Sequence, residues 1–232
     1  MIAPARYHAI SVTRETGYET GPVLTLDAQA VLLSIYEAPE YPGLLRRSLE
    51  GVLSEQSRKA ITVEQAVLAP DLAPPWIAAL LALDAQVSFA GEPSQVALAD
   101  FLRRVNPCSG GIAAVCVPLG VPGSVPGDAY LTGADAPAIA AIAIVTLTEG
   151  FVRQARLALA GVGREPARLA DSAAYLVGGP LTIRRIRHVA GRVGQEVCSP
   201  GDEGGNYAYR RAMARVLTYC ALEQCWRRAY GT

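Results

Sequence analysis

Residues 138–161, AIAAIAIVTLTEGFVRQARLALAG, decide the fold of the second half of the chain. Two runs rich in aliphatic residues, 138–148 and 151–161, are joined by Glu149 and Gly150. Such a connection is typical of a β-hairpin, because glycine readily adopts the positive φ angles of a tight turn. We therefore predict an antiparallel pair of strands here.

Three helical patterns follow the hairpin, at residues 167–177, 181–197 and 207–230. Gly178-Gly179-Pro180 and Ser199-Pro200-Gly201 separate them, and these residues interrupt helices and form turns. Strands followed by helices favour an α+β fold. We expect a small antiparallel sheet packed against the three helices, with the helices on one face.

The first half of the chain mixes strand and helix patterns. Residues 7–26 alternate as strands do, and Pro42 begins an amphipathic helix that we predict over residues 42–56. Residues 106–127 are rich in proline and glycine around an apolar run at 112–119, which is typical of a boundary. We therefore predict two domains, residues 1–105 and 128–232, joined by a linker at 106–127.

The charge of the chain is zero overall but uneven along its length. The 232 residues include 21 basic and 21 acidic side chains, so a uniformly basic nucleic-acid-binding protein is excluded. The first 150 residues carry a net negative charge and the remainder an equal positive charge. The Arg-rich run at residues 184–192 lacks the interleaved aromatics of single-strand binders, and we interpret it as a solvated or protein-docking face.

Several common sites are absent from the sequence. Lys59 is the single lysine and follows Arg58, so no Walker-type phosphate loop exists, and the glycines at 161 and 163 lack the third glycine of a dinucleotide fingerprint. The five cysteines form no Cys-x-x-Cys pair and there are only two histidines, so we predict free thiols and no metal site.

The sequence also indicates where the protein resides. Its longest apolar run, residues 136–147, contains a proline and is shorter than the roughly 20 residues that span a membrane. The first residues lack the apolar centre of a signal peptide. We expect a soluble cytoplasmic protein that binds neither nucleic acid nor membrane.

Three short sequence motifs in the second half occur in a recognisable order. They are LALAGVG at 157–163 followed by Pro166 and Arg168, YLVGGPL at 175–181, and Gly201-Asp202 leading to Tyr209-Arg210-Arg211. Together they resemble the C-terminal domain of the FAD-binding, or medium, subunit of molybdenum hydroxylases, the family of carbon monoxide dehydrogenase and xanthine dehydrogenase. The resemblance implies an α+β chain in which a shortened flavin-binding-type α/β domain precedes this C-terminal domain.

The resemblance continues upstream. Gln56, Arg58 and Thr62 look like the Gln-Ile-Arg-Asn-x-Ala-Thr-Ile-Gly-Gly-Asn segment of the flavin-binding domain, and residues 70–74 and 80–85 look like the element that follows it. By this likeness Thr62 and Asp71 are the candidate FAD contacts, Asp71 through the ribityl hydroxyls. The likeness implies no catalytic residue and no metal ligand in this chain.

Two departures from the family pattern concern the phosphate-binding loops. Where the family has Gly-Gly-Asn, so that backbone amides approach the flavin nucleotide, this chain has Glu64, Gln65 and Ala66. A carboxylate there would repel a pyrophosphate, and side chains would fill space that glycine leaves open. The family also begins with a segment whose Ala-Gly-Gly-Thr-type loop holds the pyrophosphate, and we expect this chain to start after it.

Two hypotheses follow from the resemblance. In the first, the chain has lost or weakened flavin binding and is a structural or assembly component of a complex with a molybdopterin-containing large subunit and an iron–sulfur small subunit. In the alternative, it is a working flavoprotein subunit that relays electrons from iron–sulfur clusters through FAD to an acceptor. Neither hypothesis makes the chain catalytic on its own.

Overall fold

The first half of the chain builds a five-stranded antiparallel sheet. The computed structural model describes residues 10–13, 22–39, 41–50, 53–103, 111–120, 122–132, 138–163, 165–197 and 207–231. The sheet has the order β1-β2-β5-β3-β4. Its strands are β1 Ile10–Thr13, β2 Val23–Asp27, β3 Gln86–Phe89, β4 Gln95–Ala97 and β5 Ile112–Pro118.

Strand β5 lies inside the stretch that the sequence predicted to be a linker. It pairs with β2 on one side and β3 on the other, so it is an inner strand of the first sheet. The continuous apolar run of residues 112–117 forms this strand despite the proline and glycine that flank it. The interpretation of residues 112–118 as linker is therefore wrong, and the division of the chain into domains 1–105 and 128–232 stays a prediction.

The helices of the first half are short. They are α1 Leu32–Glu37, α2 Gly43–Leu49, α3 Glu55–Ala60, α4 Val63–Leu68, the 3₁₀ turn η1 Pro70–Leu72, α5 Pro74–Ala82 and α6 Leu98–Arg103. The predicted helix 42–56 is two helices, because Ser54 accepts a hydrogen bond from the Ser57 amide and begins α3 anew. Arg58 of α3 donates to the carbonyls of Leu49 and Leu53.

The second half forms a four-stranded antiparallel sheet in the order β6-β7-β8-β9. Its strands are β6 Ser124–Leu131, β7 Ile139–Thr148, β8 Phe151–Ala160 and β9 Ala167–Arg168. Glu149 and Gly150 have φ angles of 51° and 81°, and Thr148 pairs with Phe151, which confirms the predicted hairpin. The three helices that follow are α7 Ala170–Ala174, α8 Ile183–Glu196 and α9 Tyr207–Tyr230.

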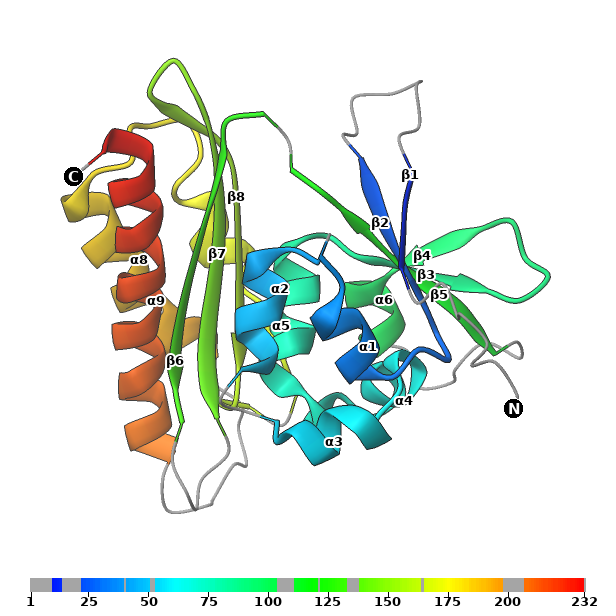
Figure 1. The fold of residues 1–232 in the computed structure, drawn as a ribbon. Helices are drawn as coiled ribbons and strands as arrows, with labels where there is room; N and C mark the ends of the chain where they lie inside the picture. Colours follow the sequence, from blue (N-terminus) through cyan, green and yellow to red (C-terminus); the bar gives the residue numbers. More distant parts are fainter. Residues whose placement is uncertain are drawn as a thin grey trace, which may run out of the picture.

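Helices cover both faces of the second sheet rather than one (Figure 1). Ala141, Ala143 and Val145 of β7 pack with α8 and α9, whereas Ile142 and Ile144 belong to the core of the first half, where α5 lies. Strand β7 is therefore buried on both sides, which explains its continuous apolar run. The three helices that follow the hairpin share one core with the sheet, as expected, and α5 of the first half adds a second layer on the other face.

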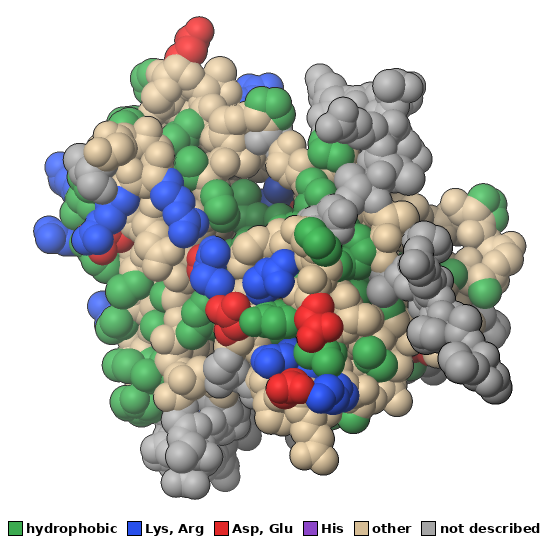
Figure 2. Space-filling model, in the orientation of Figure 1, with side chains coloured by type: hydrophobic (Ala, Val, Ile, Leu, Met, Phe, Trp, Pro, Cys, Tyr) green, Lys and Arg blue, Asp and Glu red, His purple; other side chains and the backbone are tan. Residues whose placement is uncertain are grey.

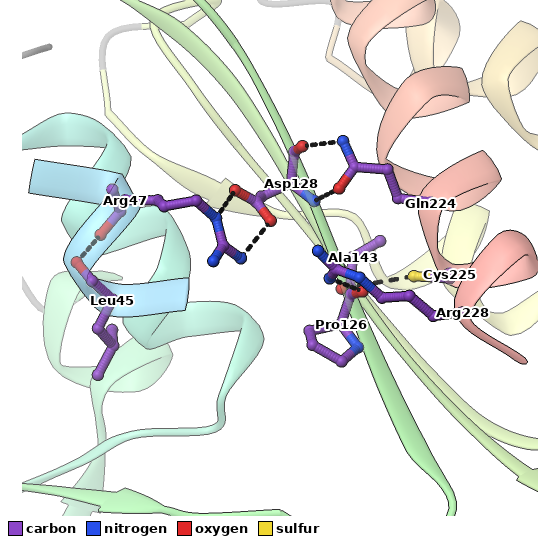
Figure 3. Close-up of polar contacts among 9 residues, drawn as sticks. Leu45, Arg47, Pro126, Asp128, Ala143, Gln224, Cys225 and Arg228 are labelled. Atoms are coloured by element: carbon purple, nitrogen blue, oxygen red, sulfur yellow. Dashed lines mark hydrogen bonds and ion pairs between the residues drawn. The ribbon is translucent and has the colours of Figure 1, made fainter. Parts of the chain in front are cut away.

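Ion pairs connect the two halves beside this apolar contact. Arg47 of α2 donates two hydrogen bonds of 2.7 Å to the carboxylate of Asp128 in β6 (Figure 3). The main chain of Asp128 is in turn bonded to the Gln224 side chain of α9, so one residue connects α2 to α9. Asp84 pairs with Arg156 and, at 2.5 Å, with Arg168.

The surface charge follows the sequence asymmetry. Acidic and basic side chains alternate over α2 and α3, whereas Lys and Arg predominate on the side where α9 lies (Figure 2). Among the described helices, none combines the length and the apolarity needed to cross a membrane. The longest of them, α9, carries arginines toward both of its ends.

Candidate functional site

Thr62, the first candidate flavin contact, is the N-cap of α4. Its hydroxyl accepts a hydrogen bond of 3.2 Å from the Gln65 amide, and the Gln65 side chain accepts one of 2.9 Å from the Thr62 amide. This reciprocal pair is a capping box. Thr62 is thus used to begin a helix.

The first four backbone amides of α4 all have partners within the chain. The Val63 and Glu64 amides donate to the carbonyls of Ala30 and Ala28, each at 2.9 Å. The Gln65 amide donates to the Thr62 hydroxyl, and the Ala66 amide donates at 3.0 Å to the Thr62 carbonyl. A helix normally leaves such amides for a cap, water or an anion, and here none is left over.

The Glu64 carboxylate is held in place by two donors from other elements. It accepts a hydrogen bond of 2.7 Å from the Gln29 side-chain amide and one of 3.3 Å from the Ile112 backbone amide, at the start of β5. Neither donor carries a formal charge, so they orient the carboxylate without cancelling its negative charge. Glu64 therefore ties α4 to the first sheet and makes the start of α4 unfavourable for another anion.

Asp71, the second candidate contact, lies in η1, beyond the other end of α4. Its side chain is exposed, and the described part of the chain offers it no hydrogen bond or ion pair. Because α4 has six residues, its ends are about 9 Å apart. The structure thus places Thr62 and Asp71 at opposite ends of one helix and does not bring them together.

These residues do not fit the pyrophosphate of a dinucleotide at the start of α4. A phosphate needs free N–H donors or cations, whereas this end of the helix offers saturated amides and a fixed carboxylate. By the sequence resemblance, the side chains of Glu64 and Gln65 also lie at positions where the family has glycine.

The described cysteines show no sign of catalytic chemistry. Cys116 and Cys225 are buried and Cys220 is partly buried, while Cys108 and Cys198 lie outside the described residues. Burial raises the pKa of the Cys225 thiol to about 12, which disfavours the reactive thiolate. In the described ranges, no three His, Cys, Asp or Glu side chains gather as a metal site would require.

Sequence reasoning did not identify the residues that organise this region. Gln29 and Ile112, the partners of Glu64, are 35 and 48 residues away from it, and Arg47 and Asp128 are 81 residues apart. No local pattern indicates such pairs. The capping box, in contrast, is visible in the sequence as Thr62 followed three residues later by Gln65.

Comparison with known proteins identifies the second half most directly. Residues 132–225 match the family model described as the CO dehydrogenase flavoprotein C-terminal domain. The matched part begins just after β6, contains the other three strands of the second sheet, β7 to β9, and ends at Cys225 in α9. A search of curated proteins finds no match to this chain.

Solved structures share the fold of nearly the whole chain. A carbon monoxide dehydrogenase from Hydrogenophaga pseudoflava has a TM-score of 0.75 at 20% identity, covering 94% of this chain and 78% of its own. Quinoline 2-oxidoreductase from Pseudomonas putida 86 has a TM-score of 0.76 at 16% identity, with the same coverage. Reconstituted CO dehydrogenase from Oligotropha carboxidovorans has a TM-score of 0.75 at 18% identity, covering 95% of this chain and 79% of its own.

At these identities the solved structures establish the fold, and the family model adds the sequence evidence. The predicted α+β fold class is confirmed. The predicted resemblance to the FAD-binding subunit of molybdenum hydroxylases is confirmed as well, by the sequence of residues 132–225 and by a fold shared over 94% of the chain.

Proposed function

We propose that this chain is a structural or assembly component of a molybdenum hydroxylase-type oxidoreductase, with flavin binding lost or weakened. Its partners are a molybdopterin-containing large subunit and an iron–sulfur small subunit, and the complex is cytoplasmic. The chain is not catalytic on its own. The observation that carries this proposal is the closed start of α4, where every amide is bonded and Glu64 is fixed.

Opening this end of α4 to a phosphate would be costly. The Val63 and Glu64 amides would have to leave the carbonyls of Ala28 and Ala30, and Ala28 is buried. Each buried polar group left without a partner costs about 1–3 kcal/mol. The Glu64 carboxylate would in addition lie close to a like charge.

The remainder of the molecule is well suited to a structural role. The second sheet is buried between helices of both halves, and Asp128, only 5% exposed, connects α2 to α9. Two halves joined through a shared apolar core and buried polar contacts present a fixed surface to other subunits. The chain keeps this framework while the start of α4 is closed to a phosphate. This combination favours a role in assembly over a role in electron relay.

Absorption spectroscopy tests the proposal. The purified chain is mixed with excess FAD, passed over a desalting column and examined for the visible flavin band. We expect no retained flavin, and we expect the Glu64→Gln variant to retain none either, because the α4 amides remain bonded. Near-stoichiometric flavin in the unaltered chain would overturn the proposal and establish the flavoprotein alternative.

A second measurement tests the assembly role. We expect the tagged chain, expressed in its source cells, to co-purify with subunits that contain molybdopterin and iron–sulfur clusters, in fixed proportions. Native mass spectrometry gives the stoichiometry. Recovery of the chain as a stable monomer, without such subunits, would contradict both the structural role and the flavoprotein alternative.

A further inference from the structure

The outer face of α8 and α9 is strongly basic. We call it the α8–α9 face and define it by its exposed arginines, which are Arg184, Arg187 and Arg192 of α8 and Arg215 of α9. The buried residues of α8, among them Ile186, Val189 and Val193, point to the sheet and leave the opposite side of the helix to these cations. The face is thus separate from α4 and from the junction of the two halves.

A groove runs between the two helices on this face. Its volume is about 490 Å³, its lining includes the small residues Ala190, Gly191 and Ala212, and Arg187 and Arg215 stand beside them. A side chain added at Gly191 would meet no atom within 4 Å, so the space above this glycine is open. Val216, also in the lining, is 50% exposed. The groove therefore has room for an apolar side chain between two cations.

The carboxylates of α8 and α9 are already engaged elsewhere. Glu196 accepts hydrogen bonds of 3.1 and 2.9 Å from the Asp171 and Ser172 amides, and so begins α7. Glu223 pairs with Arg227 at 3.3 Å on its own helix. Within the described residues, neither Arg187 nor Arg215 forms an ion pair, so their charges are available to an outside partner.

We propose that the α8–α9 face docks an acidic segment of another protein subunit. An apolar side chain of that segment occupies the groove, and its Asp or Glu side chains pair with Arg187 and Arg215. Charge complementarity identifies the partner, because carboxylates match a face on which arginines outnumber free acidic groups. Arginine at the edge of an apolar pocket is also typical of sites that contribute most to protein–protein binding.

The same arginines fit a nucleic acid less well. The chain as a whole is neutral with a pI of about 6.7, whereas nucleic-acid-binding domains are usually basic overall. The other residues that line the groove are small or aliphatic except for Tyr219, and one aromatic ring is not a row of stacking aromatics. The inference rests on the proposed function, since it assigns the surface by which this component joins its complex.

Carbodiimide cross-linking tests which groups lie against the arginines. The reagent couples lysine to carboxylates but does not couple arginine, and the chain has a single native lysine, Lys59. In the complex purified with the Arg187→Lys or Arg215→Lys variant, we expect a new cross-link from that position to an Asp or Glu of a partner subunit. The matched control is Arg153→Lys, an exposed position on β8 outside the α8–α9 face, which should give none.

Charge reversal supplies the quantitative test. We expect the Arg187→Glu, Arg215→Glu double variant to weaken subunit association about tenfold, whereas Arg153→Glu leaves it unchanged. Circular dichroism shows that each variant is folded. If the complex assembles but shows neither the cross-links nor the weakening, the inference fails and the proposed function stands.

Two other outcomes would overturn the proposed docking on the α8–α9 face. If no complex with the partner subunits forms even with the unaltered chain, both the inference and the proposed function fail. If the double variant assembles normally but loses binding to a single-stranded oligonucleotide that the unaltered chain holds, the face binds nucleic acid and the inference is overturned.

Discussion

Two sets of glycine positions distinguish the halves of this molecule. In the second half, the glycines of the family's sequence motifs are present, at Gly161 and Gly178 among others. In the first half, the sequence resemblance aligns Glu64 and Gln65 with two glycines that let the family approach a nucleotide. The comparison separates glycines that the fold itself needs from glycines that only a ligand needs.

Two glycines of the second half, Gly161 of the family motif and Gly127 upstream of it, are required by the packing. Gly161 has a φ of 75°, and a Cβ there would lie 2.1 Å from the Ala138 carbonyl oxygen. Gly127, in β6, lies against α9, where a Cβ would be 1.9 Å from the Ala221 carbonyl oxygen. In both cases the obstacle is backbone, which cannot move aside as a side chain can. These glycines are needed whether or not a cofactor binds.

The replaced positions show the opposite behaviour. Gln65 completes the capping box of α4, and Glu64 bonds to Gln29 and Ile112. These side chains stabilise the helix and its attachment to the sheet. At the start of α4 the side chains thus serve internal contacts, whereas Gly161 and Gly127 meet steric requirements of the scaffold.

The largest expected effect is that of Gly161→Ala. The new side chain would occupy a left-handed backbone conformation and collide with the Ala138 carbonyl. We expect the free energy of unfolding to fall by about 3 kcal/mol, since overpacking and backbone strain act together. Urea denaturation followed by circular dichroism measures this change.

Gly163→Ala is the matched control for that substitution. Gly163 lies two residues further on, and its nearest neighbour to an added Cβ is the Glu165 carbonyl oxygen at 4.0 Å. We expect the free energy of unfolding to stay within about 0.5 kcal/mol of the unaltered value. Similar losses of stability in both alanine variants would show that packing does not distinguish Gly161 from Gly163.

The next effect concerns the ion pair that joins the halves. In the Arg47→Ala variant, the buried carboxylate of Asp128 loses both hydrogen bonds from the guanidinium. A full loss of a buried pair costs about 3–5 kcal/mol, but the Arg47 side chain is 40% exposed and water replaces part of its contact. We therefore expect a decrease of about 2 kcal/mol in the free energy of unfolding.

A surface pair provides the comparison for Arg47. Lys59 and Glu55 form an exposed ion pair on α3, and we expect Lys59→Ala to leave the denaturation midpoint unchanged. A double-mutant cycle with Asp128→Asn isolates the coupling between Arg47 and Asp128. Additive effects of those two substitutions would mean that the contact does not hold the halves together.

The predictable parts of this molecule are those specified locally. The turn at Glu149 and Gly150 and the full extent of α9, residues 207–230, follow from neighbouring residues, and both are observed. The single helix predicted at 42–56 was wrong because an amphipathic pattern continues across the cap at Ser54. Burial of the second face of β7 could not be predicted either, since it depends on α5, which lies more than fifty residues earlier in the chain.

The candidate site was harder to predict because one residue type serves two purposes. A threonine before a helix can contact a ligand or cap the helix, and the sequence resemblance emphasised the first role for Thr62. The Gln65 three residues later indicated the second role, which the structure shows. That Glu64 is held by Gln29 and Ile112 depends on chain topology and has no local signature.

The smallest expected effect tests Thr62 as a cap against Thr62 as a ligand contact. Thr62→Ala removes the acceptor for the Gln65 amide, and we expect the free energy of unfolding to fall by about 1 kcal/mol. Thr62→Ser keeps the hydroxyl and should restore nearly all of the loss, whereas Asp71→Ala, on an exposed side chain, should change stability by less than about 0.5 kcal/mol. Urea denaturation measures all three. If the same variants instead leave stability unchanged and Asp71→Ala lowers FAD retention several-fold, the two ends of α4 act in binding, and the contrast between the halves disappears.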